Sequence, residues 1–359
     1  MSEHRIVILG AGYAGLAAAQ EARKADGAHV TVIDPHTEFV DRVRLHQVAA
    51  GQHVRRWELR KTLAAKGIEF VNGRAERIDT ETRRVELATG ETVAYDSLIY
   101  ALGSRADLSM VPGAAEFAHT VATSEDVRRI PALTGRVAVV GGGATGLETV
   151  TELAESHPDL EVVLVSSDEP GGWLIPKAVA HIRKVLDRLG VAVRVAKVAA
   201  VTATGLELVD GDHLDADIVL WTTGFTVPEV AARSGLPVDG RGRVLVDERL
   251  QVRGLADVYA VGDAAVMVGF NGREARMSCQ AALPAGKYLG TAVADRVRGK
   301  QPGAFRPRFL LTCMSLGRRD GLVQFMKADD SNGSVALTGR PAAWIKEQIV
   351  SGVARAVKP

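Results

Sequence analysis

The chain has 359 residues, with 44 basic and 43 acidic side chains and a formal net charge of +1. This length favours two domains over one, and the balanced charge gives no reason to expect nucleic acid or another highly charged partner. Two cysteines, Cys279 and Cys313, form neither a CxxC nor a metal-ligand pattern, so we expect no disulfide framework and no metal site.

No apolar stretch approaches the ~20 residues that span a bilayer. The first apolar run, at residues 6–9, is too short for the core of a signal peptide, and Ser2 stands where myristoylation needs glycine. We therefore expect a cytoplasmic protein, with peripheral membrane contact left open.

Residues 6–34 follow the order strand, glycine turn, helix, strand. The helix is expected at 16–24, and the second strand, at 30–33, ends in Asp34, about 20 residues after the glycines, as the ribose of a dinucleotide requires. In such a turn the glycines permit a tight bend, close approach of a pyrophosphate and packing of helix on strand. They form GxGxxG at Gly10, Gly12 and Gly15.

The same plan returns in the second half of the chain. A strand at 137–140 precedes a helix at 147–156 and a strand at 161–165, and the glycines between them are Gly141, Gly143 and Gly146. Further on, Gly103 in YALGS and Gly224 in WTTGF each follow an aspartate by seven residues. One GxGxxG also occurs where no nucleotide binds, but two in register favour two tandem dinucleotide domains.

The intervening segments complete the expected fold. Residues 74–96 and 197–217 alternate in polarity and predict antiparallel strands, 111–135 predicts a linker with a helix, and 280–297 predicts a late helix. We expect an α/β protein with two Rossmann-like three-layer domains and a small C-terminal α+β region of two strands around GRRDG and a terminal helix. The expected bounds are 1–105 with 244–305 for the first domain, 106–243 for the second and 306–359 for the C-terminal region.

Two dinucleotides on one chain predict electron transfer between them. A nicotinamide brings a hydride, and a flavin is the cofactor that can hold it. The chain would then need one phosphate-binding turn for each redox cofactor.

Five segments resemble, in sequence and order, those of two-dinucleotide-binding-domain flavoproteins of the pyridine nucleotide-disulfide oxidoreductase superfamily. They are VILGAGYAGL, YALGS, VVGGGATGLET, WTTGF and VYAVGDAA. The segment SLGRRDGLVQF and the short C-terminal region resemble the branch of type II NADH:quinone dehydrogenases and apoptosis-inducing-factor-like, or ferroptosis-suppressor, quinone reductases.

This resemblance implies FAD on the first glycine turn and NAD(P)H on the second. Asp34 would bind the adenosine ribose of FAD, or serve only as a turn residue before Pro35. Asp263 would bind the ribityl chain or the pyrophosphate, or cap the following helix. Arg42 would lie along the flavin or be a solvated charge. Further cofactor positions implied are Tyr13, Ala14, Ala75 through its backbone, Ala101, Thr145 and Gly262.

Two residues are implied in catalysis. Glu148 is expected on the first turn of the second nucleotide helix, between nicotinamide and flavin, where it would orient the carboxamide or influence proton delivery. The alternative is a first-turn Glu favoured by the helix dipole. Gln280, in SCQAALPAG, fits loosely the Ala-Gln pair of type II dehydrogenases, and Cys279 there is expected to be a small buried residue.

Three features depart from the families or leave a choice open. Ser166 and Ser167 stand where NADH-selective sites have an acid, with no adjacent Arg or Lys, so the choice of NADH or NADPH is open. The segment EFVDRVRLHQVAAG lacks the dithiol of disulfide reductases, so electrons must leave the flavin directly. The terminal helix carries an apolar face that predicts docking on the protein rather than on a membrane; its residues are Trp344, Ile345, Ile349, Val353 and Val357.

We therefore expect an FAD-dependent NAD(P)H dehydrogenase that gives two electrons to a quinone. The alternatives are a reductase for a small redox protein such as ferredoxin or rubredoxin, and a flavin-based, redox-responsive interaction protein without turnover. The identity of the acceptor and formation of a homodimer are left open.

Overall fold

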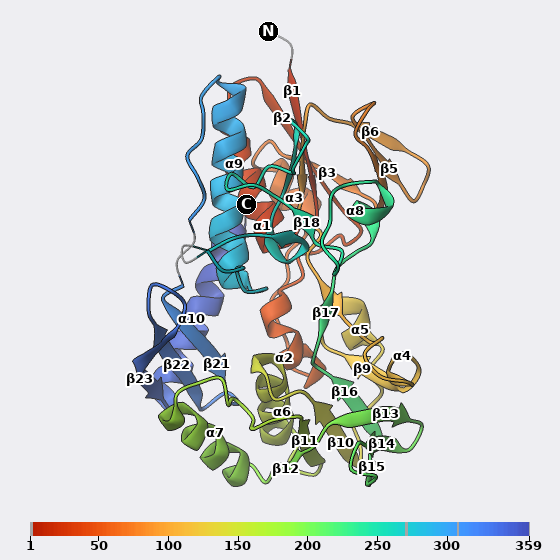
Figure 1. The fold of residues 1–359 in the computed structure, drawn as a ribbon, viewed down its shortest axis with the longest axis vertical. Helices are drawn as coiled ribbons and strands as arrows, with labels where there is room; N and C mark the ends of the chain where they lie inside the picture. Colours follow the sequence, from red (N-terminus) through yellow and green to blue (C-terminus); the bar gives the residue numbers. More distant parts are fainter. Residues whose placement is uncertain (1–2, 270–271, 307–308, 359) are drawn as a thin grey trace.

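The computed structural model describes residues 3–269, 272–306 and 309–358. It contains two α/β units, one above the other along the long axis, and a smaller C-terminal unit beside them (Figure 1). The expected fold class, two Rossmann-like units with a small α+β appendage, is confirmed.

The first unit is built on a parallel sheet of five strands in the order β19-β7-β1-β2-β3. Apart from the partly exposed edge strand β3, these strands are short apolar runs largely buried on both faces, as in a sheet covered by helices. The strands of the sheet are β1 (His4–Leu9), β2 (Ala28–Asp34), β3 (Glu69–Asn72), β7 (Ser97–Tyr100) and β19 (Val258–Ala260).

The second unit repeats this order as β9-β16-β10-β11-β12, again all parallel. Its strands are β9 (Ala118–Thr120), β10 (Arg136–Val140), β11 (Glu161–Ser166), β12 (Ala192–Val195) and β16 (Ile218–Trp221). The edge strand differs in origin: β9 precedes the second glycine turn, whereas β19 reaches the first sheet only after the chain has completed the second. Residues 118–120, expected in a linker, are therefore part of a sheet.

Matching hydrogen bonds explain the repeated spacing from aspartate to glycine. Asp96 accepts from the N–H of Arg5 at 2.8 Å, and Asp217 accepts from the N–H of Arg136 at 2.7 Å. Asp96 thus fixes the start of β7 beside the start of β1, and Asp217 fixes the start of β16 beside the start of β10. The glycine seven residues after each aspartate then lies just beyond the opposite, carboxyl end of the same strand.

Each unit also carries the antiparallel sheet expected between its glycine turn and its closing glycine. The strands are β4 (Ala75–Asp79), β5 (Arg84–Leu87) and β6 (Thr92–Ala94) in the first unit and β13 (Val198–Thr202), β14 (Gly205–Leu208) and β15 (His213–Asp215) in the second. Two short pairs complete the connections: β8 (Arg105–Ala106) with β17 (Phe225–Thr226), and β18 (Val244–Leu245) with β20 (Ala265–Val266).

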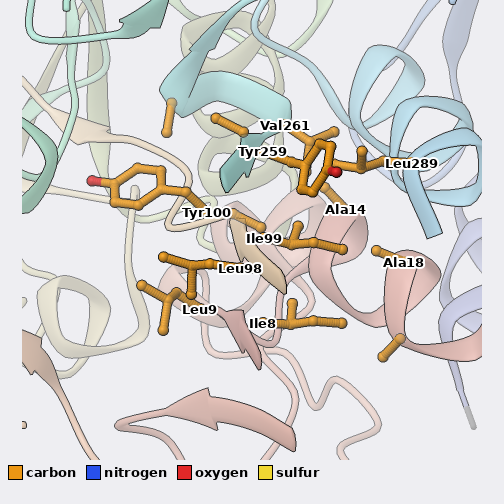
Figure 2. Close-up of a cluster of buried hydrophobic side chains, with 14 of the residues drawn as sticks. Ile8, Leu9, Ala14, Ala18, Leu98, Ile99, Tyr100, Tyr259, Val261 and Leu289 are labelled. Atoms are coloured by element: carbon orange, nitrogen blue, oxygen red, sulfur yellow. The ribbon is translucent and has the colours of Figure 1, made fainter. Parts of the chain in front are cut away.

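Small residues let two helices of the first unit pack closely. A Cβ on Gly286 would lie 2.2 Å from Ala14 O, and one on Gly290 would lie 2.2 Å from Ala18 O. Figure 2 shows Ala14 and Ala18 on α1 (Tyr13–Ala22) facing the same core as Leu289 of α9 (Cys279–Val297). This contact holds the helix after the first glycine turn against the late helix.

The C-terminal unit consists of β21 (Leu311–Ser315), β22 (Gly321–Met326), β23 (Asn332–Thr338) and α10 (Arg340–Val357). The expectation of two strands was wrong, because residues 332–338 add a third antiparallel strand to the edge of β22. Residues 307, 308 and 359 of the expected C-terminal region lie outside the described residues. The remaining helices are η1 (Arg42–Arg44), α2 (Leu45–Ala49), α3 (Leu59–Ala64), α4 (Ala114–Phe117), α5 (Ser124–Arg128), α6 (Ala144–Ser156), α7 (Pro176–Arg188), α8 (Val230–Arg233) and η2 (Gly262–Ala264).

One segment packs differently from the expected domain bounds. Val227, Val230 and Leu236 lie in the hydrophobic core of the first unit, although residues up to 243 were expected in the second. We propose a boundary near residue 226, just after the paired strands β8 and β17 that connect the units.

Candidate active site

The first glycine turn joins β1 to α1, and its three glycines have different surroundings. Gly10 has φ of +102°, and its N–H donates to Ile33 O at 2.8 Å. A Cβ on Gly15 would lie 1.9 Å from Gly10 O, so only glycine lets α1 begin so close to β1. A Cβ on Gly12 would meet nothing within 4 Å, which leaves the backbone there open to a ligand.

The second glycine turn, from β10 to α6, repeats this geometry. Gly141 has φ of +125° and donates to Val165 O at 2.8 Å, and a Cβ on Gly146 would lie 1.8 Å from Gly141 O. Gly143 is open in the same way as Gly12.

Both turns fit a pyrophosphate. Neither α1 nor α6 has a side-chain cap, so their first N–H groups and the positive end of each helix dipole are free for an anion. Thr145 lies half-buried on the first turn of α6, and its contact with the second nucleotide stays a prediction. The residues present thus fit one dinucleotide in each unit.

Asp34 is held by its own chain at the end of β2. Its Oδ2 accepts from the N–H of Ala11 at 2.7 Å, and its Oδ1 accepts from the N–H of His36 at 2.8 Å. His36 also contacts Asp34 through Nδ1 at 2.7 Å and Glu125 through Nε2 at 2.8 Å. The hydrogen bond with Asp34, together with the two carboxylate charges, raises the pKa of His36. Asp34 therefore forms the expected turn and also ties the glycine loop to β2, while its contact with the ribose stays a prediction.

The equivalent position in the second unit is Ser166. The N–H of Gly10 donates to the carbonyl of Ile33, the residue before Asp34. In the same way, the N–H of Gly141 donates to the carbonyl of Val165, the residue before Ser166. Ser166 is buried, and a Cβ on Gly142 would lie 2.2 Å from its Oγ. The second site therefore has a hydroxyl where the first has a carboxylate, so the structure leaves the choice between NADH and NADPH open.

Three polar residues meet at the carboxyl ends of β7 and β19. Ser104 Oγ donates to Asp263 Oδ2 at 2.7 Å, Arg42 Nη1 donates to Ser104 O at 2.7 Å, and the same Nη1 lies 3.7 Å from Asp263 Oδ2. Arg42 is thus an ordered partner rather than a solvated charge. Asp263 does not cap α9, because Ser278 does so, accepting from the N–H of Ala281. Gly103 and Gly262 adjoin this cluster in the chain.

The other expected cofactor positions lie around the first turn or between the units. Tyr13 is buried and donates through Oη to Asp41 at 2.5 Å, which anchors the segment before η1. Ala14 is covered by α9, Ala101 O lies 2.5 Å from where a Cβ on Gly10 would be, and Ala75 is buried at the start of β4. Gly224, with φ of +74°, directly precedes β17 and packs against Met110.

Glu148 is part of a buried ion pair. It is the fifth residue of α6, which begins at Ala144, so the expected position on the first turn was wrong and the dipole alternative with it. Lys346 Nζ of α10 lies 2.9 Å from its Oε1, and the N–H of Ser315 donates to the same oxygen at 3.0 Å. Burial is the largest single effect on Glu148 and would raise its pKa, but the charge and hydrogen bond of Lys346, the charge of His46 and the N–H of Ser315 together lower the pKa. Glu148 in turn raises the pKa of Lys346 despite the burial of the ammonium.

The loop after β21 is bound along one face of α6. Gly317 donates its N–H to Thr151 Oγ1 at 3.0 Å, and Arg318 Nε donates to Glu152 Oε2 at 2.8 Å. Next to Lys346, Glu347 accepts from Arg44 Nη1 at 3.0 Å. Lys346 therefore binds the second unit, and its neighbour on α10, Glu347, binds the first unit.

Lys346 is the functional candidate that sequence reasoning missed. Its residue type and its place on an amphipathic terminal helix predict only a flanking charge. The signal is its burial, with a side chain only 13% exposed, and burial follows from the docking of α10 on β21 and β22.

Gln280 and Cys279 form the first two positions of α9, and both are half-buried. Burial raises the pKa of the Cys279 thiol to about 11, an effect to which the charges of Glu148 and Asp263 add. Burial thus favours the neutral thiol of Cys279. The role of Gln280 stays a prediction.

The terminal helix is docked on the protein, but its expected apolar face is divided. Of the expected residues, Val357 is buried, Ile345, Ile349 and Val353 are half-buried, and Trp344 is 66% exposed. Val350, outside the expected face, is buried as well. Within the described ranges, no helix has the length and apolar character to cross a membrane.

Comparison with known proteins places the chain in a family. Residues 4–286 match the family described as pyridine nucleotide-disulphide oxidoreductase. An NADH dehydrogenase-like protein of Mycobacterium tuberculosis is 29% identical over 96% of this chain and 92% of its own length. Ferroptosis suppressor protein 1 of Xenopus tropicalis is 30% identical over 89% and 88%, and the type II NADH:quinone oxidoreductase of Staphylococcus haemolyticus is 24% identical over 96% and 94%.

Solved structures share the fold across the whole chain. The sulfide:quinone oxidoreductase of Aquifex aeolicus has a TM-score of 0.83 at 17% identity, covering 99% of this chain and 91% of its own. A ferredoxin reductase of Rhodopseudomonas palustris has a TM-score of 0.78 at 24% identity, covering 90% and 82%. With two matching dinucleotide turns and a family match over most of its length, this chain belongs to the pyridine nucleotide-disulphide oxidoreductases and is an oxidoreductase whose cofactors are FAD and NAD(P)H.

Proposed function

We propose that this protein oxidises NAD(P)H through FAD and delivers two electrons to a quinone. The observation that carries this proposal is the buried Glu148–Lys346 pair, which brings a carboxylate of the nucleotide helix together with an ammonium of the C-terminal unit. The relatives named for NADH and quinone chemistry span nearly all of this chain and support the same reaction.

In this mechanism the two glycine turns hold the cofactors. The free amides after Gly12 would bind the FAD pyrophosphate, and those after Gly143 would bind that of NAD(P)H. Asp34 would accept from the FAD ribose, and Asp263, ordered by Ser104 and Arg42, would accept from the FAD at the ends of β7 and β19. FAD, when bound, supplies the ability to take a hydride and release two electrons.

The chain itself supplies charge at the site. Lys346 makes one contact to Glu148 and donates to Cys313 O at 3.3 Å, which leaves one of its three N–H donors for a ligand. Because Glu148 keeps it charged, Lys346 would stabilise negative charge on a quinone oxygen as electrons arrive. Glu148 would orient the ammonium of Lys346 and pass a proton to the quinone.

Rapid anaerobic mixing tests the function. The flavin-loaded protein is reduced with NADH or NADPH and then mixed with menadione, a soluble ubiquinone analogue, or a ferredoxin. Fast bleaching of the flavin followed by fast reoxidation by a quinone is the expected result. Reoxidation only by the carrier protein would favour the redox-protein reductase, and slow reduction with a long-lived charge-transfer complex would favour the interaction protein.

Peripheral membrane contact is a separate part of the proposal. The exposed Trp344 is the side chain of α10 placed to reach a lipid surface. Cosedimentation with anionic vesicles, reduced in a Trp344→Ser variant, is the expected result, and equal cosedimentation of both proteins would contradict it.

A further inference from the structure

A buried histidine packs against α6, the helix that carries Glu148, and one of its ring nitrogens has no hydrogen-bond partner among the described residues. His46, in α2, is 4% exposed, and α2 packs against α6. Among the described residues its Nε2 has no hydrogen-bond partner, and the nearest acid oxygen, Glu152 Oε2, lies 3.9 Å away. Buried polar atoms are nearly always hydrogen-bonded, so such a nitrogen calls for an explanation.

Charged groups from four elements face this imidazole. Glu148 and Glu152 lie one turn apart on the same face of α6, Lys346 comes from α10, Arg318 from the loop after β21, and Arg44 from η1. Burial, helped by the three cations, lowers the pKa of His46 to about 4, although Glu148 opposes this. His46 is therefore neutral near pH 7, with one nitrogen that donates and one that accepts.

Glu152 connects this histidine to the surface. It is fully buried, and its oxygens accept from Arg318 Nε at 2.8 Å and from Gln52 Nε2. Gln52 and Arg318 both reach the surface, so one layer of side chains separates Glu152 from solvent. Burial raises the pKa of Glu152, whereas its ion pair with Arg318, at 2.6 Å, opposes this, so the carboxylate is placed to take a proton from solvent and release it.

We propose that His46 relays a solvent proton from Glu152 to the Glu148–Lys346 pair. The proposal rests on the proposed function, in which NAD(P)H, a proton and a quinone give NAD(P)+ and a quinol. The hydride brings two electrons and one proton, so the second proton must come from water. Glu152 gives a proton to Nε2 of His46, the imidazolium releases one from Nδ1 through water to the Glu148 carboxylate, Glu148 passes it to the reduced quinone oxygen, and Glu152 is reloaded from solvent.

The 3.9 Å separation sets one condition on this relay. It is longer than a direct hydrogen bond, so transfer needs a small rotation of the Glu152 side chain or a bridging water. The transfer leaves the ring proton on the opposite nitrogen, so a water-assisted proton exchange between the two nitrogens must restore the starting tautomer before the next cycle. His46 has no net change of charge over the cycle.

The test compares His46→Gln with His53→Gln, a change of the same type at an exposed histidine of the same segment. In anaerobic mixing, flavin bleaching by NADH uses no solvent proton and should be unchanged in both variants. Reoxidation by the soluble ubiquinone analogue should slow at least about tenfold in His46→Gln alone, and its solvent deuterium effect should increase. Equal slowing of both half-reactions would show a structural role and overturn the relay.

A second measurement does not depend on turnover. In protein with 15N-labelled histidine, NMR should show a neutral His46 from pH 5.5 to 8, with ring signals that shift in Glu152→Gln. A protonated His46, or no response to that substitution, would overturn the relay. Normal quinone reduction by His46→Gln would refute the relay alone, whereas no quinone reduction by the unchanged protein would refute the proposed function as well.

Discussion

Replacing Lys346 by Met should destabilise the folded protein strongly. Met fills a similar volume but leaves the Glu148 carboxylate buried without its cation. Breaking one side of a buried ion pair costs about 3–5 kcal/mol, and we expect about 3 because Ser315 still donates to the carboxylate. The comparison is Lys287→Met, at an exposed lysine of α9.

The assay is urea unfolding at pH 7 with saturating FAD, followed by far-ultraviolet circular dichroism. A double-mutant cycle with Glu148→Gln isolates the pair. Each single change leaves one buried polar partner unmatched, so the double variant should lose about 2 kcal/mol less than the sum of the two single losses.

The pH dependence has a defined sign. In the unchanged protein the pKa of Glu148 is lower in the folded state than in the unfolded state. Its contribution to the free energy of unfolding is therefore complete above the unfolded-state pKa and is lost as the pH falls through the folded-state pKa. Without Lys346, burial would raise that pKa, and stability would be lost as pH rises. The difference in the free energy of unfolding between the unchanged protein and Lys346→Met should therefore be smaller at pH 5 than at pH 7. Additive single effects, or a loss no larger than that of Lys287→Met, would refute the reasoning.

Three further substitutions follow from the structure. His46 has a pKa of about 4 against 6.5 unfolded, so the protein should lose about 3 kcal/mol as pH falls through that window, and thermal melting of His46→Gln should lack this loss. Gly286→Ala should cost about 1–3 kcal/mol and weaken FAD binding by fluorescence titration, because its Cβ would meet Ala14 O, whereas Gly352→Ala, in open space on α10, should cost nothing. Ser166→Asp should raise the KM for NADPH about tenfold and leave that for NADH nearly unchanged, because its carboxylate would meet the 2′-phosphate; equal effects on both would contradict this.

The duplicated architecture could be predicted because its signals are local. Gly10 and Gly15, like Gly141 and Gly146, must be glycine where helix and strand approach within contact, and this requirement is written in consecutive residues. The same holds for Asp96 and Asp217, each of which binds the first residues of a neighbouring strand.

The candidate site could be predicted only in part, because its decisive contacts join distant segments. The sequence marks Glu148, but nothing near it specifies Lys346, whose position depends on how α10 docks on β21 and β22. The third strand of that sheet, residues 332–338, contains Gly and Ser and has no strong strand pattern, and its place is set by the exposed edge of β22.

The charge pair also bears on how the protein is made. Gly10 and Glu148 both precede Lys346 in the chain and are therefore synthesised before it. A nascent chain can therefore fold its first nucleotide turn while Glu148 still lacks a counter-charge, and a product that stops before α10 keeps both glycine turns but no completed site. The buried pair is therefore completed only once α10, which follows both glycine turns, has been synthesised and has docked.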